Sequence, residues 1–183
     1  ISFVDDLSNW YVRRSRRHFQ KPESVAEKNK AAQTLYLTLL TLAKLVAPFI
    51  PFLAEEIYLG LKKTRMAESV HLCDWPELDK TLINENLEEK MTQLRQVVAQ
   101  ALAQRASAGI KVRQPLASLK IKNQKLKTDK ELLELIKDEI NVKAVIFDEE
   151  LKGGEVKLET KITKELKAEG LAREIVRALQ DMR

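Results

Sequence analysis

The 183-residue sequence contains a single cysteine, Cys73, and two histidines, His18 and His71. One cysteine cannot form an intramolecular disulfide, which is typical of a protein kept in a reducing compartment. Zinc sites need several cysteine, histidine or carboxylate ligands close together, and two histidines far apart in sequence do not predict one. We therefore expect neither a disulfide framework nor a metal site.

Glycine and proline are also scarce, with five of each. A turn-rich β-sandwich, a collagen-like repeat and a disordered linker would need more of both. The longest apolar stretch, residues 35–53, is interrupted by Lys44, Pro48 and Pro51, so it does not predict a transmembrane helix. Arginines follow the first apolar residues instead of preceding them, which excludes a signal-peptide pattern. The sequence predicts a soluble, cytoplasmic chain with no membrane partner.

Charged residues, by contrast, make up 32% of the sequence, beside 44% apolar residues. This composition favours a buried core combined with long charged helices. The 32 lysines and arginines exceed the 27 acidic residues, which gives a formal net charge of +5. Such a mild excess is compatible with nucleic-acid binding but does not indicate it by itself.

The first half of the sequence has the apolar spacing of amphipathic helices. The first predicted helix ends near Phe19, because a Lys-Pro pair follows. Ser24 can cap a second helix, since Glu27 three residues later completes a capping box. Pro48 ends this helix, and Pro51 suits the first turn of a third, where its missing N–H costs nothing.

A fourth long helix is predicted from apolar residues spaced between Leu87 and Leu102, with Gly109 as its C-terminal cap. Four helices with few glycines between them indicate a bundle. We therefore assign residues 1–109 to a helical bundle.

The apolar period then changes, and residues 110–183 predict a small α+β subdomain. Residues 112–121 have the spacing of a strand, and Pro115 confines its start to a sheet edge or a bulge. Thr128 can cap a following helix, which Asn141 would end.

Two more strands and a last helix complete this subdomain. Residues 142–147 and 155–160 have strand-like patterns, and Gly153-Gly154 predicts a hairpin turn between them. Thr163 can cap the last helix, whose pattern still continues at Arg183. Because the chain also begins in helical register, we expect it to be cut from something larger and truncated at its C-terminus. The predicted fold class is mainly α, a helical bundle followed by a small α+β subdomain.

The most unusual segment combines arginines with Trp10 and Tyr11 near the N-terminus. Arg13, Arg16 and Arg17 share one helix face through i+3 and i+4 spacing. Guanidinium groups fork onto phosphate oxygens and stack on bases, so this combination suits RNA. The alternative is a solvated face with ion pairs inside the bundle, because short basic clusters are common on helices.

Arg14 points toward another side of this helix. We expect it to form a structural ion pair with Glu55 or Glu56, two acids that stand among apolar residues. Lys111 and Arg113 form a second basic group where the fourth helix passes into the first strand. A phosphate contact and ordinary outward strand patterning remain equally open for these two cations.

No catalytic constellation is visible in the sequence. The glycines are isolated or lie in a turn, so no phosphate-cradling loop is predicted. The histidines have no Ser or Cys partner in a recognisable motif. Cys73 beside Trp75 is most simply a small apolar filler. We expect no catalytic residue, no metal ligand and no cofactor in this chain.

Five segments, spread over nearly the whole chain and in the family's order, resemble the anticodon-binding and junction region of isoleucyl-tRNA synthetases, which are class I aminoacyl-tRNA synthetases. The second segment is shared more loosely with the valyl and leucyl relatives, whereas the last two are similar to the isoleucyl type in particular. The segments are SNWYVRRSRR at residues 8–17, APFIPFLAEEIY at 47–58, AGIKVRQPL at 108–116, EGLARE at 169–174 and QDMR at 180–183.

The resemblance implies the part of an isoleucine–tRNA ligase that grips the anticodon arm of isoleucine tRNA. The His-x-Gly-His and Lys-Met-Ser-Lys-Ser signatures of the catalytic domain are absent from the sequence. The parent catalytic domain, acting in cis with ATP and Mg²⁺, would carry the ligase activity, and the parent protein is expected to be a monomer. Aromatic residues would pack or stack, and cations would contact phosphates; the predicted RNA-binding residues are Trp10, Tyr11, Arg13, Arg16 and Arg17, followed by Lys111 and Arg113.

The sequence departs from the family at one place. His18 and Gln20 stand where many members carry Arg and Trp, which weakens a phosphate contact and a stacking platform. Two alternatives remain open: the equivalent domain of a valyl- or leucyl-tRNA synthetase, and a helical protein-interaction module without RNA binding. Salt-dependent RNA binding separates the second alternative from the synthetases, and tRNA identity separates the synthetases from one another.

Overall fold

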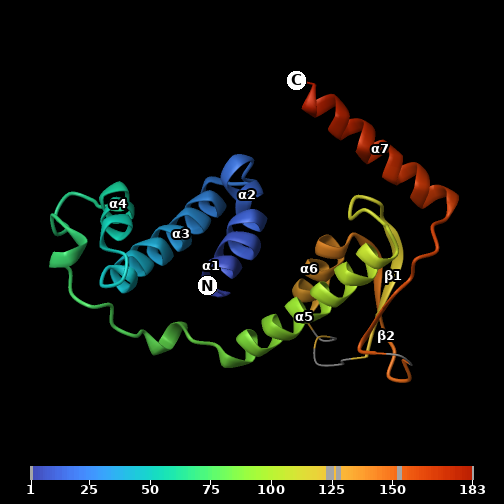
Figure 1. Ribbon diagram of the computed structural model, residues 1–183, viewed down its shortest axis with the longest axis horizontal. Helices are drawn as coiled ribbons and strands as arrows, with labels where there is room; N and C mark the ends of the chain where they lie inside the picture. Colours follow the sequence, from blue (N-terminus) through green and yellow to red (C-terminus); the bar gives the residue numbers. More distant parts are fainter. Residues whose placement is uncertain (1, 123–125, 127–128, 152–153, 183) are drawn as a thin grey trace. The chain divides into compact units, whose positions relative to one another are not determined.

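The computed structural model describes residues 2–122, 126, 129–151 and 154–182 (Figure 1). Helices dominate these residues, and one small sheet follows in the second half, which confirms the predicted fold class. The chain divides into two compact units, Ile1–Lys80 and Thr81–Arg183. No helix in the described ranges is both long and apolar enough to cross a membrane.

The first unit begins with a continuous helical run where the sequence predicts one helix. Its middle turn is π-helical, because the amide of Arg13 donates to the carbonyl of Ser8, five residues earlier. The predicted helix is therefore right in extent and differs in this turn. The run consists of α1 (Ser2–Asp6), η1 (Leu7–Val12) and α2 (Arg13–Gln20).

The next helix, α3 (Val25–Val46), starts at the predicted cap. The hydroxyl of Ser24 accepts a hydrogen bond from the amide of Glu27 at 3.1 Å. The Glu27 carboxylate reaches back and accepts one from the amide of Glu23 at 2.8 Å. These bonds satisfy donors that the helix itself leaves unpaired at its N-terminus.

A small core forms where α3 meets α4 (Pro51–Leu61) and the short 3₁₀ turn η2 (Val70–Leu72). Tyr58 is fully buried there, and its hydroxyl donates to the carbonyl of Ala67 at 2.9 Å. Hydrogen bonding with the Cys73 side chain, together with burial, raises the pKa of Tyr58 to about 12. The buried core residues are Ala43, Ala47, Ala54, Tyr58 and Val70.

In its described residues, the second unit consists of a three-stranded sheet and three α-helices, preceded by the short 3₁₀ turn η3 (Lys80–Leu82). Its strand order is β2-β1-β3, with β1 parallel to β2 and antiparallel to β3. A helix connects the two parallel strands, as a crossover between parallel strands requires (Figure 1). The elements are α5 (Glu85–Ser107), β1 (Leu116–Ile121), α6 (Lys130–Ile140), β2 (Val142–Phe147), β3 (Val156–Leu158) and α7 (Lys164–Asp181).

Several predicted ends of elements in this unit are confirmed. Gly109 has a φ of 66°, a left-handed conformation that favours glycine, directly after α5. Asn141 ends α6 in the same region, with a φ of 57°. The hydroxyl of Thr163 accepts from the amide of Leu166 at 3.3 Å and so caps α7.

Two details of the prediction are wrong, the start of the first strand and the pairing of the third strand. The first strand starts at Leu116 instead of residue 112, because the amide of Gln114 donates to Lys111 in a turn that Pro115 follows. Asp129 caps α6, with its carboxylate accepting from the amide of Leu132 at 3.4 Å.

The predicted cap, Thr128, lies outside the described residues. The third strand, β3, pairs with β1 and not with β2, so the predicted hairpin between the second and third strands does not form. Gly153 of its predicted turn also lies outside the described residues.

The long helix α5 packs against α6 and β3. The side chain of Gln104 pairs with β3 as a neighbouring strand would. Its Nε2 donates to the carbonyl of Val156, and its Oε1 accepts from the amide of Leu158, both at 2.8 Å. Because of these contacts α5 belongs with the sheet, and the chain divides after Lys80, whereas the sequence places the division after Gly109.

Arg105, near the end of α5, is completely buried. Its Nη1 donates to the carbonyls of Lys111 at 3.0 Å and Gln114 at 2.9 Å, and its Nη2 donates to the carbonyl of Asn141 at 3.0 Å. Burial lowers the pKa of Arg105, but an arginine starts from so high a value that it keeps its charge at neutral pH. One buried cation thus joins α5, the turn before β1 and the junction of α6 with β2.

Asn141 holds the same turn through its side chain. Its Nδ2 donates to the carbonyls of Val112 at 2.9 Å and Arg113 at 3.0 Å. The carbonyls of all the residues 111–114 therefore accept hydrogen bonds from either Arg105 or Asn141. The turn takes its conformation from these two side chains.

Replacing Tyr58 by Phe should lower the free energy of unfolding of the first unit by about 1 kcal/mol, because the carbonyl of Ala67 loses its donor. The Tyr36→Phe variant is the matched control, since its hydroxyl meets only the weak acceptor Sδ of Met66 at 3.6 Å. The pKa of Tyr58 is raised in the folded state, so the Tyr58 hydroxyl should stabilise the fold fully up to about pH 10. This stabilisation should be lost as the pH rises toward 12, where the hydroxyl ionises in the folded state as well. Urea unfolding at several pH values measures this, and equal losses in both variants would contradict it.

Replacing Arg105 by Met should destabilise the second unit by about 3 kcal/mol, because three backbone carbonyls lose a charged donor that lies in the core. Arg95→Met, on the same helix, is the matched control. Arg95 is partly exposed, so its loss should amount to about 1 kcal/mol or less. Thermal unfolding of both variants tests this, and coincident midpoints would contradict the anchoring role of Arg105.

Candidate nucleic-acid interface

The arginine-rich segment of the first unit occupies η1 and α2, and α2 packs on α3. Arg13, Arg16 and Arg17 are exposed, whereas Ser15 between them is buried and Arg14 is half-buried. The helix therefore turns Ser15 toward the protein and presents the three predicted cations to solvent. This arrangement follows from helical periodicity alone.

The exposed arginines differ in the contacts that their side chains already make within the protein. The Nε of Arg13 donates to the carbonyl of Asn9 at 2.7 Å, which fixes its side chain along the helix. Arg17 pairs with Glu23 at 2.8 Å, with both side chains about three-quarters exposed. Arg16 has no hydrogen-bond or ion-pair partner among the residues that the structure describes. An incoming phosphate can therefore bind Arg16 directly and compete with a weak surface pair at Arg17.

Trp10 and Tyr11 both lie half-buried in the π-helical turn. The hydroxyl of Tyr11 donates to the carbonyl of Ala31 in α3 at 3.1 Å. Tyr11 thus links the first helical run to α3. Of the two roles predicted for the aromatic residues, packing and stacking, this contact corresponds to packing. Trp10 keeps part of its surface exposed beside the arginines. A π-helical turn is itself frequent at functional sites.

Glu55 has a structural role in the first unit. Its Oε2 accepts hydrogen bonds from the hydroxyl of Ser69 at 2.9 Å and from the amide of Val70 at 2.8 Å. These bonds hold the loop after α4 against that helix. The predicted ion pair of Arg14 with Glu55 or Glu56 stays a prediction.

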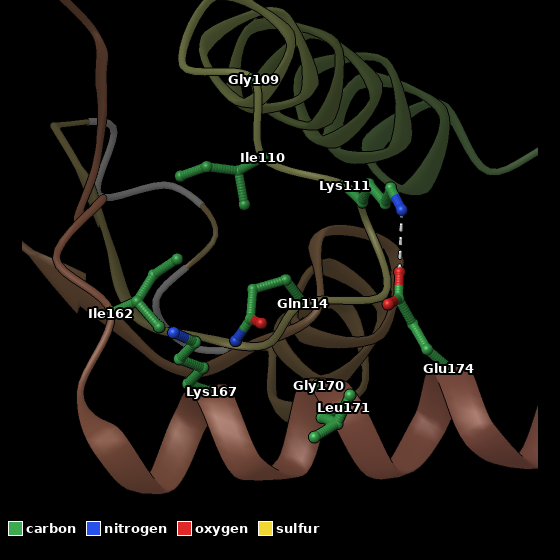
Figure 2. A pocket seen from close by; sticks show the side chains of 9 residues that line it. All are labelled: Gly109, Ile110, Lys111, Gln114, Ile162, Lys167, Gly170, Leu171 and Glu174. Carbon is green, nitrogen blue, oxygen red and sulfur yellow. Dashed lines mark hydrogen bonds and ion pairs between the residues drawn. The ribbon is translucent and has the colours of Figure 1, made fainter.

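The second predicted basic group lies on the turn before β1. Figure 2 shows Lys111 reaching across to Glu174 of α7, with the Nζ and Oε1 atoms 3.0 Å apart. This hydrogen bond, together with the charges of Lys111, Arg113 and Arg177, lowers the pKa of Glu174 below its ordinary value. Arg113, two residues along, is exposed, and its side chain has no hydrogen bond or ion pair within the described part of the chain.

Gln114 joins this turn to α7. Its Nε2 donates to the carbonyl of Leu166 at 2.6 Å and to that of Pro115 at 3.1 Å. The amide end of Gln114 occupies the space that a Cβ at Gly170 would need, so a glycine at this helix position allows the close approach (Figure 2). A cavity of about 320 Å³ remains beside these residues, with Lys111 and Lys167 at its wall.

Three cations near this turn were not predicted from the sequence. Lys137 of α6, Lys143 of β2 and Arg173 of α7 line a cavity of about 490 Å³ together with Arg113. Lys137 and Lys143 stand close to Asn141 in the sequence, and this is the only signal that could have suggested them. Arg173 is far from the turn in the sequence, and only the tertiary structure brings it next to Asn141.

The structure therefore places the predicted residues in two groups on different units, the arginines of α2 on the first and Lys111 with Arg113 on the second. Within the described ranges no cluster of three histidine, cysteine, aspartate or glutamate side chains is arranged to hold a metal ion. What the two groups share is exposed positive charge with guanidinium donors, which suits phosphate oxygens.

Comparison with known proteins gives this arrangement a family. Residues 1–121 match the family described as the anticodon-binding domain of tRNA ligase. The match covers the arginine-rich helix, the α3–α4 core, α5 and β1.

Among curated proteins, the isoleucine–tRNA ligase of Chlamydia pneumoniae is 44% identical over 152 residues, which cover 82% of this chain and 15% of the relative. The isoleucine–tRNA ligase of Dehalococcoides mccartyi strain CBDB1 is 43% identical over 203 residues, covering 99% of this chain and 20% of the relative. That of Chlamydia caviae is 41% identical over 152 residues, or 82% of this chain and 15% of the relative. This chain thus spans a fifth or less of the length of these relatives. With its match over residues 1–121, the chain belongs to the family of anticodon-binding domains of tRNA ligases.

Proposed function

We propose that this chain binds the anticodon arm of isoleucine tRNA and positions it for aminoacylation by a catalytic domain of the same protein. The row of exposed arginines on α2, in a chain of the anticodon-binding family, is the observation that carries the proposal. The three relatives are isoleucine–tRNA ligases, which favours isoleucine tRNA over valine or leucine tRNA. Membership of this family also argues against a protein-interaction module without RNA.

The chemistry assigned to the chain is recognition without catalysis. Arg13, Arg16 and Arg17 would contact phosphates of the RNA backbone, with Trp10 offering its exposed surface to a base or sugar. ATP and Mg²⁺ would act only in the catalytic domain. The proposal further includes a monomeric parent enzyme that works in the cytoplasm.

Binding should depend steeply on salt, because phosphate contacts release counterions. Each phosphate neutralised adds roughly 0.7 to 0.9 to the slope of log affinity against log salt concentration. The contacts that we propose are confined to the anticodon arm, so we expect a Kd on the order of micromolar and modest selectivity.

Replacing Arg13, Arg16 and Arg17 together by Gln should lower this slope by about two to three units and leave the fold intact, since exposed arginines contribute little to stability. Fluorescence titration of isoleucine tRNA at several salt concentrations measures the slope, and circular dichroism monitors the fold. The matched control replaces three cations at the other end of the same unit, after α4, by Gln; they are Lys62, Lys63 and Arg65.

Equal slopes for the two triple variants would place the RNA surface away from α2. Unfolding of the α2 variant would instead assign these arginines a structural role. Tighter binding of valine or leucine tRNA than of isoleucine tRNA would contradict the assigned substrate.

A further inference from the structure

The second unit carries a set of cations of which only Arg113 was predicted from the sequence. We call it the Asn141 cluster, and it consists of Arg113, Lys137, Lys143 and Arg173. The four side chains come from the turn before β1, the last turn of α6, the start of β2 and the middle of α7. They line one cavity of about 490 Å³, whose wall also includes the side chain of Asn141.

Asn141 explains why these elements meet. Its amide Nδ2 donates to the carbonyl of Arg113 at 3.0 Å, and its Oδ1 accepts from Nη1 of Arg173 at 2.8 Å. Its left-handed backbone turns the chain from α6 directly into β2, so Lys137 and Lys143 lie on either side of it. The backbone that carries Arg113 is held from both sides, by Asn141 and by Arg105. The cluster is thus preorganised by buried or half-buried groups.

The acids near the cluster offset part of its charge. Glu134 pairs with Lys137 at 2.7 Å, and Asp138 also lines the cavity. A single carboxylate, Glu169, serves both Lys143 and Arg173, each at 2.7 Å. The hydrogen bond from Lys143 is the main reason why the pKa of Glu169 lies below its ordinary value.

Arg113 acts on the nearby Glu174 carboxylate through its charge, without a direct pair between them in the described residues. Its guanidinium is exposed and makes no hydrogen bond or ion pair with any residue in the described ranges. It offers five N–H donors in a planar fork that matches two oxygens of a phosphate.

The positive surface also extends beyond one cavity. An adjoining cavity of about 480 Å³ shares Arg113 and Arg173 and adds Arg177 of α7. Arg177 pairs with Asp181 at 3.1 Å, and this exposed pair is weak enough for a phosphate to compete with it. Arginines along two cavities that share lining residues suit a polyanion better than a single free anion, because successive phosphates can each meet a cation.

From this geometry we propose that the Asn141 cluster binds the phosphodiester backbone of RNA, so that the second unit makes its own contact with tRNA. The proposal rests on the proposed function of the chain as a tRNA-binding domain. The proposal adds a second RNA-binding surface, whose cations come from several elements that tertiary contacts bring together. The arginines of α2, by contrast, all lie on one helix.

The test removes two cations from the cluster. The double variant Arg113→Gln with Lys143→Gln should lower the salt slope for isoleucine tRNA by about one to two units. Both side chains are exposed, so circular dichroism should show an unchanged fold. The matched control removes two exposed cations at the far ends of β1 and α6, Lys122→Gln with Lys130→Gln, and should leave the slope within about half a unit of the unmodified chain.

A site-specific readout accompanies the slope. The side-chain amide of Asn141 gives its own NMR signals, and we expect tRNA or a short single-stranded RNA to shift them in the unmodified chain but not in the Arg113→Gln/Lys143→Gln variant. Inorganic phosphate at the same phosphate concentration should shift them far less, because it lacks the repeated charge of RNA. An equal shift by inorganic phosphate would show that the cluster is a general anion site and overturn its assignment to RNA.

The outcomes separate this proposal from the proposed function. If the unmodified chain binds no tRNA, both are wrong. A slope that falls in the triple α2 variant but is equal in the cluster and control variants would overturn the cluster alone. A slope that falls only in the cluster variant would keep this inference and remove α2 from the RNA surface.

Discussion

A guanidinium withdrawn completely from water is the contact on which the second unit depends. Burying a charge is costly unless it is hydrogen-bonded, and Arg105 meets this requirement with three backbone carbonyls, two in the turn before β1 and one at the junction of α6 with β2. The carbonyls gain as well, since a buried carbonyl without a donor is itself destabilising. Its Nε has no hydrogen-bond partner in the structure, so the fork of the two Nη atoms makes all of these contacts. A lysine could not join three carbonyls at once in this planar geometry.

This anchor determines how the basic residues of the second unit are presented. The turn at residues 111–114 has every carbonyl bound by Arg105 or Asn141, so the side chains that leave it have fixed starting points. Lys111 is directed to Glu174 on α7, while Arg113 remains exposed beside cations of α6, β2 and α7. Rigid elements position charged groups better than mobile loops do, because less conformational entropy is lost when a ligand binds.

The first unit presents its cations by a different physical route. On α2 the spacing of the arginines along one helix is enough to bring them to the solvent side, with Ser15 turned inward. The neighbouring aromatic residues divide their roles. Tyr11 is fixed to α3 through its hydroxyl, and Trp10 keeps exposed surface next to the arginines. Two basic surfaces of unlike origin thus occur in one chain of the anticodon-binding family.

Local chemistry was sufficient for much of this protein. The caps at Ser24 and Thr163, the glycine after α5 and the left-handed Asn141 were all predictable, because each depends on hydrogen bonds or backbone angles within a few residues. The exposed row on α2 follows from helix periodicity for the same reason. The pairing of β3 with β1, the place of α5 beside the sheet and the convergence of Arg173 with Arg113 were not predictable in this way. They join residues far apart in the sequence, and only the tertiary structure decides which of many possible long-range contacts are made.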